Sequence, residues 1–388
     1  MSDEDFLLLN PGPVPVTETV REAMAEPMVS HRSAEFEAVY ERAVSGLEYV
    51  FTQSTMDASK TAADGRSLVL NGTATMGMEA AVANLDPDEV VALVNGKFGR
   101  RFARIADRYA RVETVDADWG DSLDVDAVSE AITDDTDVVT MVHNETSTGI
   151  LNPVPPVGEL AAEHDAYFVV DGVTSIGGDE FRIDDWNVDV AVTDTQKALA
   201  APPGVSAMYV TGRAIDAFDG DRAPFYEDLD WHVRKAADNQ TPFTSAVPLF
   251  RGLAVAVEQI ELESMPARIR RHRHFAAAFR DGFEAMGLSL FPQLNVDSAY
   301  SNTVTAVSLP EVIRDDPGGF FDAVAARNVS ISGGQAHLGG EIFRVSNMGE
   351  LEPEHVVRGV RTVGEALVEA GFDAAVEAGV TAATDRLE

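Results

Sequence analysis

The sequence predicts an α/β fold, with a mostly parallel mixed sheet flanked by helices and a smaller α+β domain at the C-terminal end. The length of 388 residues exceeds the usual size of one domain, which favours two domains. Short apolar runs alternate with helical patterns between residues 67 and 210, as is typical of a parallel sheet covered on both faces. After about residue 250 the pattern changes to long helical stretches followed by isolated strands.

The first predicted elements build the sheet and its helices. An irregular opening, Asn10 to Pro15, precedes a helix for which Ser33 is the expected N-cap. Strands are then expected at residues 67–70, 90–94, 138–142, 166–170, 188–193 and 205–210. Helices are expected at residues 75–85, 98–109 and near 157–163.

The remaining elements form the smaller domain. A helical region from Pro248 to Met286 is expected to break at Pro266. Strands are expected at residues 302–309, 328–332 and 341–346, and a final helix at residues 353–370. The domain limits predicted from these patterns are an N-terminal arm at 1–16, a large domain at 17–264 and a small domain at 265–388.

The chain is strongly acidic, with a net charge of −36 from 65 acidic and 29 basic residues. This excess is unfavourable for binding nucleic acid or an anionic membrane, so neither is expected as a partner. Two interpretations of the acidity remain open. One is a surface suited to a high-salt cytoplasm, as in an acidic, halophilic-type proteome, and the other is an acidic docking surface.

No cysteine is present, so disulfides and cysteine nucleophiles are excluded. The stretch Met1 to Phe6 lacks the features of a signal peptide, and no apolar run reaches the roughly 18 residues of a membrane span. We therefore expect a cytoplasmic protein. His143 and Glu145 lack the further spacing of a metal site, and no metal is expected.

An acid and an amine follow two consecutive predicted strands. Asp171 ends the first strand, and Lys197, one of four lysines, follows the second. A carboxylate that pairs with a ring nitrogen and an amine that condenses with an aldehyde are what pyridoxal phosphate requires. The alternatives are an ordinary loop lysine and an aspartate that caps a helix or a turn.

Three further segments fit the same cofactor. Asn71 to Thr75 lies between a strand and a helix, where backbone N–H groups can bind phosphate. Phe98 begins a helix after a glycine and could stack on a ring, or it could be a core aromatic. Arg344 lies on an apolar strand, where it would bind a substrate carboxylate, form an internal salt bridge or face outward.

One basic run, Arg268 to His274, has no place in this chemistry. We expect it to form a solvated helix face or an intersubunit contact.

Together these segments resemble the class-V, fold-type I aminotransferases that depend on pyridoxal phosphate, specifically the alanine–glyoxylate and serine–pyruvate group. The resemblance covers essentially the whole chain. It is carried most specifically by 28–33, 143–149, 170–175 and 196–199, with support from 241–244 and 333–335.

The resemblance implies roles for further residues. Those implied to surround the cofactor are Thr73, Ala74, Thr75, Phe98, Thr146, Asp171, Val173, Gln196 and Lys197. Thr241 and Thr244 would reach its phosphate from a neighbouring subunit, which implies a homodimer with shared active sites. Arg344 would bind the substrate α-carboxylate, and the Gly12 region would limit the size of the substrate side chain. Asn347 and its neighbours depart from the family pattern, so the support of Arg344 could differ.

The function implied is ping-pong transamination, in which alanine or serine donates an amino group and glyoxylate or pyruvate accepts it. Lys197 would act as general base and acid. An aspartate or 2-aminoethylphosphonate aminotransferase and another reaction of the same fold remain open, although the lack of cysteine argues against a desulfurase. The alternative from another class of protein is a non-catalytic binding module.

Overall fold

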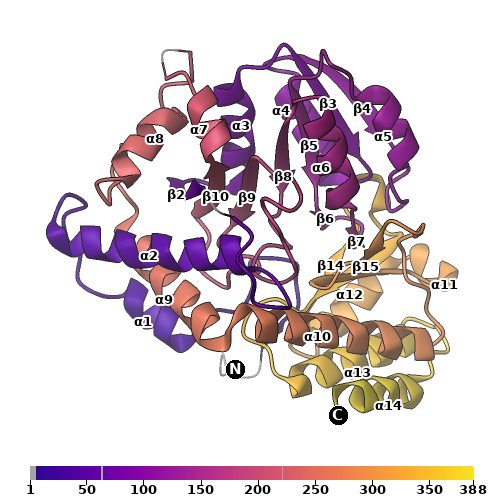
Figure 1. Ribbon diagram of the computed structural model, residues 1–388. Coiled ribbons are helices and arrows are strands. Elements are labelled where there is room, and N and C mark those ends of the chain that lie inside the picture. Colours follow the sequence, from indigo (N-terminus) through magenta and orange to yellow (C-terminus); the bar gives the residue numbers. More distant parts are fainter. Residues whose placement is uncertain (1–5, 63, 221) are drawn as a thin grey trace.

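A computed structural model of the chain describes residues 6–62, 64–220 and 222–388 and contains a large and a small lobe (Figure 1). The large lobe is built on a seven-stranded sheet with the order β2-β10-β9-β8-β5-β3-β4. Its strands are β2 (Gly65–Asn71), β3 (Glu89–Val94), β4 (Arg111–Asp116), β5 (Val138–Val142), β8 (Tyr167–Asp171), β9 (Val190–Asp194) and β10 (Val205–Thr211). Only β10 runs opposite to the other six strands of this sheet, so the prediction of a mostly parallel mixed sheet is confirmed.

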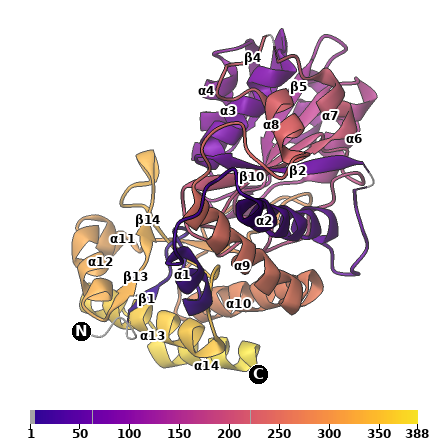
Figure 2. The same ribbon diagram turned by 90° about the vertical axis from the view of Figure 1, so that its left-hand side faces the viewer.

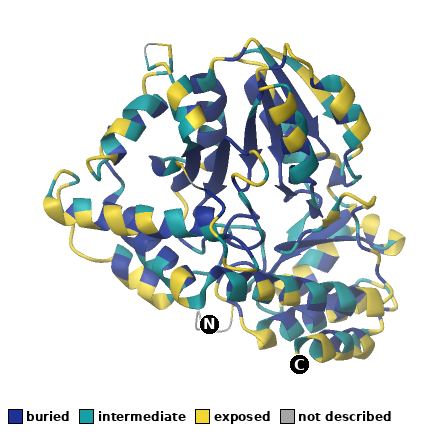
Figure 3. Ribbon diagram, viewed as in Figure 1, coloured by how far each residue is buried: buried dark blue, intermediate teal, exposed yellow. Residues whose placement is uncertain are grey.

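The central strands are buried on both faces because helices cover the sheet (Figure 3). Strands β5 and β9 have every residue buried and are rich in valine, which suits a pleated interior position. The edge strand β4 is mostly exposed and polar, and the sequence analysis missed it for that reason. Apolar patterns therefore locate buried strands, the edge strand β2 included, but not an exposed and polar strand such as β4.

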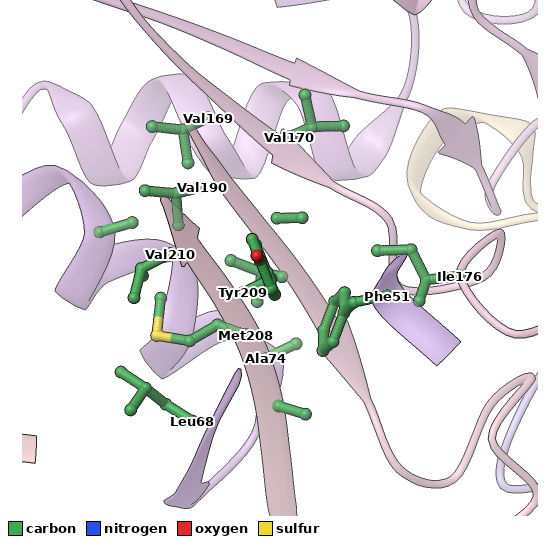
Figure 4. Close-up of a cluster of buried hydrophobic side chains, with 14 of the residues drawn as sticks. Phe51, Leu68, Ala74, Val169, Val170, Ile176, Val190, Met208, Tyr209 and Val210 are labelled. Carbon is green, nitrogen blue, oxygen red and sulfur yellow. The ribbon is translucent and has the colours of Figure 1, made fainter. Parts of the chain in front are cut away.

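Nine helices of the large lobe lie in the described part of the chain (Figure 2). They are α1 (Glu18–Met24), α2 (Ala34–Gln53), α3 (Ala74–Leu85), α4 (Lys97–Ala106), α5 (Val125–Ala131), α6 (Val154–Glu163), α7 (Gly212–Ala217), α8 (Leu229–Ala236) and α9 (Val247–Glu263). The predicted N-cap is confirmed, because the Ser33 side chain accepts a hydrogen bond from the Phe36 N–H. Figure 4 shows how Phe51 of α2 and Tyr209 of β10 join the buried cluster around the sheet.

The small lobe follows Ser264, a residue with φ of +68° that separates α9 from α10. The break lies at Ser264 rather than at Pro266, which is in the first turn of α10. A missing backbone N–H costs nothing in that turn, because it would have no partner within the helix. The helices of this lobe are α10 (Met265–Ala285), α11 (Glu311–Arg314), α12 (Pro317–Ala325), α13 (Pro353–Glu369) and α14 (Val376–Leu387). Helix α14 follows the helix that was predicted to be the last, and its small residues give only a weak apolar pattern.

The sheet of the small lobe has the order β12-β15-β14. Its strands are β12 (Val304–Ser308), β14 (Ser332–Gly333) and β15 (Ile342–Ser346). A second, two-stranded sheet joins β1 (Leu7–Leu8) to β13 (Val329–Ser330) in parallel. The predicted arm therefore packs on the small lobe, although residues 1–5, which include most of the stretch examined for a signal peptide, lie outside the described residues.

Buried apolar side chains form two main clusters. One extends from Val20 to Ile269 around the seven-stranded sheet, and the other joins Leu7 and Leu9 to residues 275–383. The domain limits given above stay a prediction.

Candidate active site

A cavity of about 250 Å³ lies where the central strands end. This is the edge at which ligands bind in open α/β sheets, and polar residues that follow different strands meet there. The lining residues are Thr73, Ala74, Thr75, Met78, Phe98, Arg101, Thr146, Asp171, Val173, Asp194, Gln196 and Lys197. Nine residues implied to surround a cofactor are thus brought together.

Lys197 follows β9 and points its amine toward the N-terminal arm. Its Nζ donates a hydrogen bond to the Pro11 carbonyl oxygen over 2.6 Å. Burial lowers the pKa of Lys197, and the nearby Asp194 carboxylate opposes that shift. Gly12 has φ of +123°, and a Cβ atom there would lie 2.6 Å from this Nζ, so another residue would strain the backbone and displace the lysine.

Asp171 ends β8 and is 3% exposed. Its Oδ1 accepts a hydrogen bond from the Val173 N–H over 2.9 Å. Burial raises the pKa of Asp171 to about 7, and the nearby carboxylates of Glu145 and Asp194 add to the shift. The site therefore holds a carboxyl group that a cation could readily ionise.

The N-terminus of α3 forms another wall of the cavity. Thr73 is its N-cap but makes no capping hydrogen bond through its side chain. Backbone N–H groups in the first turn of a helix are suited to bind an anion. Asp194 also lines this cavity, and burial raises the pKa of its carboxyl group.

Glu145 holds the start of α4 and thereby places Phe98. The Glu145 Oε2 accepts hydrogen bonds from the N–H groups of Phe98 and Gly99 over 3.0 and 2.9 Å. Its Oε1 accepts hydrogen bonds from the backbone N–H and the side-chain hydroxyl of Ser147. Glu145 is therefore a buried cap of α4.

Arg344 lies on β15, beside the cavity but outside its lining. Its guanidinium donates to the backbone oxygen of Gly333 over 3.1 and 2.8 Å and to that of Thr146 over 2.9 Å. Burial lowers the pKa of Arg344 to about 10. No carboxylate within the described chain forms a salt bridge with Arg344, and the side chain is buried. The two alternatives considered for it, an internal salt bridge and an outward-facing position, are therefore wrong.

Asn347, the departure from the family pattern, forms no hydrogen bond with Arg344 in the described part of the chain. Its Nδ2 donates to the backbone oxygens of His272 and Asn302, each over 2.9 Å. This amide therefore links β15 to α10 and to the start of β12.

Thr241 and Thr244 do not line the cavity within one chain. The Thr241 hydroxyl donates to the Phe243 carbonyl, and the Thr244 carbonyl accepts from Asn71 Nδ2, at the end of β2. Their role toward the phosphate of a neighbouring subunit stays a prediction.

Sequence reasoning missed three residues of the lining: Met78, Arg101 and Asp194. Helical and strand periodicity contain a signal for each of them. Arg101 lies three residues after Phe98 on α4, and Met78 lies three after Thr75 on α3. Asp194 is the last residue of β9, at the strand end where ligands of such sheets bind.

Comparisons with known proteins agree with this geometry. The sequence model described as aminotransferase class-V matches residues 11–336. An uncharacterized aminotransferase of Methanocaldococcus jannaschii is 36% identical, over 98% of this chain and 97% of the relative. The L-aspartate–glyoxylate aminotransferase of Paracoccus denitrificans is 31% identical, over 97% and 94% of the two chains.

A solved structure has the same fold. The alanine–glyoxylate aminotransferase of Nostoc sp. superposes with a TM-score of 0.81 and 29% identity, over 95% of this chain and 96% of that chain. Fold and relatives together define a fold-type I transaminase that depends on pyridoxal phosphate. Within this class, the chain belongs to the class-V aminotransferases.

The cavity fits pyridoxal phosphate on its own chemistry. It contains a buried amine, a buried carboxyl group and a helix N-terminus whose N-cap side chain, Thr73, makes no capping hydrogen bond. The buried Oδ1 of Asp194 and Oε1 of Gln196 have no hydrogen-bond partner within the described residues. Such orphaned oxygens indicate a polar ligand.

No helix within the described ranges is both long and apolar enough to span a membrane.

Proposed function

We propose that this class-V transaminase moves the amino group of a small amino acid, alanine or serine, to glyoxylate or pyruvate. The observation that carries the proposal is the placement of Lys197 and Asp171 in one cavity of about 250 Å³. The Nostoc and Paracoccus proteins named above, which use glyoxylate according to their names, support glyoxylate as acceptor.

Eight residues of the cavity have a proposed role in holding the cofactor. Asp171 pairs with the ring nitrogen, Phe98 and Val173 cover the two ring faces, and Thr146 and Gln196 flank the ring and its phenolic oxygen. The first turn of α3, with Thr73, Ala74 and Thr75, holds the phosphate. Thr241 and Thr244 of a second subunit complete the phosphate site in a homodimer.

When bound, pyridoxal phosphate supplies an aldehyde that condenses with amines and a ring that accepts electrons. Lys197 is proposed to take the proton from the substrate α-carbon at its Nζ and to return a proton later in the cycle. Burial favours the neutral amine that this step requires, because it lowers the pKa of Lys197.

Arg344 is proposed to bind the α-carboxylate of each substrate. Its planar guanidinium is held by two backbone carbonyl groups, so its position is set before a carboxylate arrives. Gly12 lies against Lys197 and limits the space for the substrate side chain.

The test is the substitution Lys197→Ala. We expect loss of the absorption band of the lysine-linked cofactor and loss of transamination, measured by mixing the purified protein with alanine or serine and glyoxylate. The exposed Lys60, changed to alanine, is the matched control and should retain both signals. Turnover like that of the unmodified enzyme in Lys197→Ala would refute the proposal.

A further inference from the structure

A second, larger cavity adjoins the first. It has a volume of about 740 Å³ and shares Thr75 and Arg101 with the cavity described above. Trp119 and Ala336 also line this cavity. Ala336 belongs to the small lobe and lies three residues after Gly333, whose carbonyl oxygen accepts a hydrogen bond from Arg344. We call this space the vestibule.

The vestibule is cationic although the chain as a whole is acidic. Five basic side chains and one acidic side chain line it: Lys97, Arg100, Arg101, Arg104, Arg108 and Asp107. The chain as a whole carries 65 acidic residues against 29 basic ones. The sign of the charge at this opening is therefore the reverse of that of the whole molecule.

Most of these cations are not neutralised. Arg100 pairs with Asp116, and Arg101 donates to the Thr75 hydroxyl over 2.9 Å. Lys97, Arg104 and Arg108 form no salt bridge with any residue that the structure describes. An unpaired cation has its charge available for a ligand.

The arrangement is unfavourable for the helix itself. Lys97, Arg101, Arg104 and Arg108 are spaced by four, three and four residues, which places them on one face of α4 and its C-terminal end. Like charges at this spacing repel each other. Attraction to the helix dipole accounts for Arg104 and Arg108 near the C-terminus, but Lys97 lies in the first turn, where a cation is disfavoured.

We propose that the vestibule binds the second acidic group of a dicarboxylic substrate, so that the donor range includes aspartate. The α-carboxylate has its own arginine at Arg344, and the vestibule, which shares Thr75 and Arg101 with the first cavity, offers further cations. A polyanion such as nucleic acid is disfavoured by the net charge of −36, whereas a small acid can enter the cavity. The inference rests on the proposed transaminase function and adds a substrate class to it.

The experiment compares L-aspartate with L-asparagine, its neutral isostere, as amino donor to the holoenzyme with glyoxylate. The measured quantity is the ratio of the two kcat/KM values. At low salt we expect aspartate to be preferred by about tenfold or more, and the preference to shrink near 1 M salt, where charges are screened over about 3 Å.

The variant Lys97→Gln/Arg104→Gln should lower this ratio about tenfold, while Arg104→Lys should retain most of it. Arg361→Gln removes one charge from the exposed pair between Arg361 of α13 and Glu377 of α14 and is the control for net charge, so its ratio should not change.

Three outcomes would overturn the inference. One is an equal reaction with aspartate and asparagine in the unmodified enzyme. Another is an unchanged ratio in the double variant. The third is that the double variant dissociates an oligomer and lowers kcat/KM equally for all donors. That result would show that the vestibule is a subunit contact. Failure of alanine, serine, aspartate and asparagine alike to change the cofactor spectrum would refute the proposed function itself.

Discussion

Helices α10 and α4 are both basic, but they differ in whether their cations form salt bridges. On α10, Arg268, Arg271 and Arg273 form salt bridges with Glu263, Asp179 and Glu180. On α4, Lys97 and Arg104 line a cavity without an acidic partner in the described chain. Paired cations hold segments of the fold together, whereas unpaired cations beside a cavity are available to a ligand.

Arg268 is a buried example of the paired kind. It is 5% exposed and donates to the backbone oxygens of Gly177 and Ala198 over 2.7 and 2.6 Å, next to Lys197. The basic run that was expected to be a solvated face or an intersubunit contact thus includes a cation inside the chain. This correction follows from the tertiary position of Glu263 and of the two carbonyl groups.

The largest expected effect is therefore on stability. Arg268→Met leaves two buried carbonyl groups and part of Glu263 without their partner, and we expect a loss of about 3–5 kcal/mol. The measurement is denaturant unfolding of the holoenzyme. The exposed Arg104→Gln is the matched variant on α4 and should change stability by less than about 0.5 kcal/mol. Similar losses in the two variants would remove the distinction between paired and unpaired cations.

A second test concerns Arg344, which is buried and has no acidic partner in the described chain. Arg344→Lys keeps the charge but loses the planar fork that can bind a carboxylate through two hydrogen bonds. We expect KM for donor and acceptor to rise about 100-fold, which corresponds to about 2.7 kcal/mol. Steady-state kinetics would measure both constants. The exposed Arg314→Lys, which pairs with Glu341, is the control, and an unchanged KM in Arg344→Lys would place the substrate carboxylate elsewhere.

Asp171, like the unpaired cations, forms no salt bridge in the described part of the chain. Burial raises its pKa to about 7 from a model-peptide value of about 3.9. The folded state without cofactor therefore holds this proton more tightly than the unfolded state. As a result, the contribution of this group to stability is complete below about pH 4 and is lost as the pH rises from about 4 to about 7, by at most about 1.4 kcal/mol per pH unit.

Without cofactor, the unmodified chain should lose stability between pH 5 and pH 8 relative to Asp171→Asn, which has no carboxyl group to ionise at this position. Denaturant midpoints at the two pH values would show this. With pyridoxal phosphate bound, the cationic ring nitrogen should remove the penalty, so this relative loss should disappear. An identical pH dependence of the two cofactor-free proteins would contradict the raised pKa.

The comparison also explains how far the sequence alone can be interpreted. The ends of apolar strands predicted Asp171 and Lys197 at one sheet edge, because the topology of parallel sheets brings such ends together. The edge strand β4 and the helix α14 escaped prediction, since one is polar and the other rich in small residues.

Charge pairing lay beyond the sequence for a physical reason. Arg268 and Arg104 look alike in sequence, and their difference depends on which acids the fold brings near. Glu145 is a similar case, since only the folded chain shows that it caps α4 at Phe98 and Gly99.

The N-terminal segment has a consequence for handling the protein. Residues 7–8 are a strand of the small lobe, and Pro11 and Gly12 lie against the amine of Lys197. A protease that trims the chain past Gly12 would leave the lysine and the aspartate in place and still open the wall beside them. An active preparation should therefore be checked by mass spectrometry for an intact N-terminus as well as by the absorption of the bound cofactor.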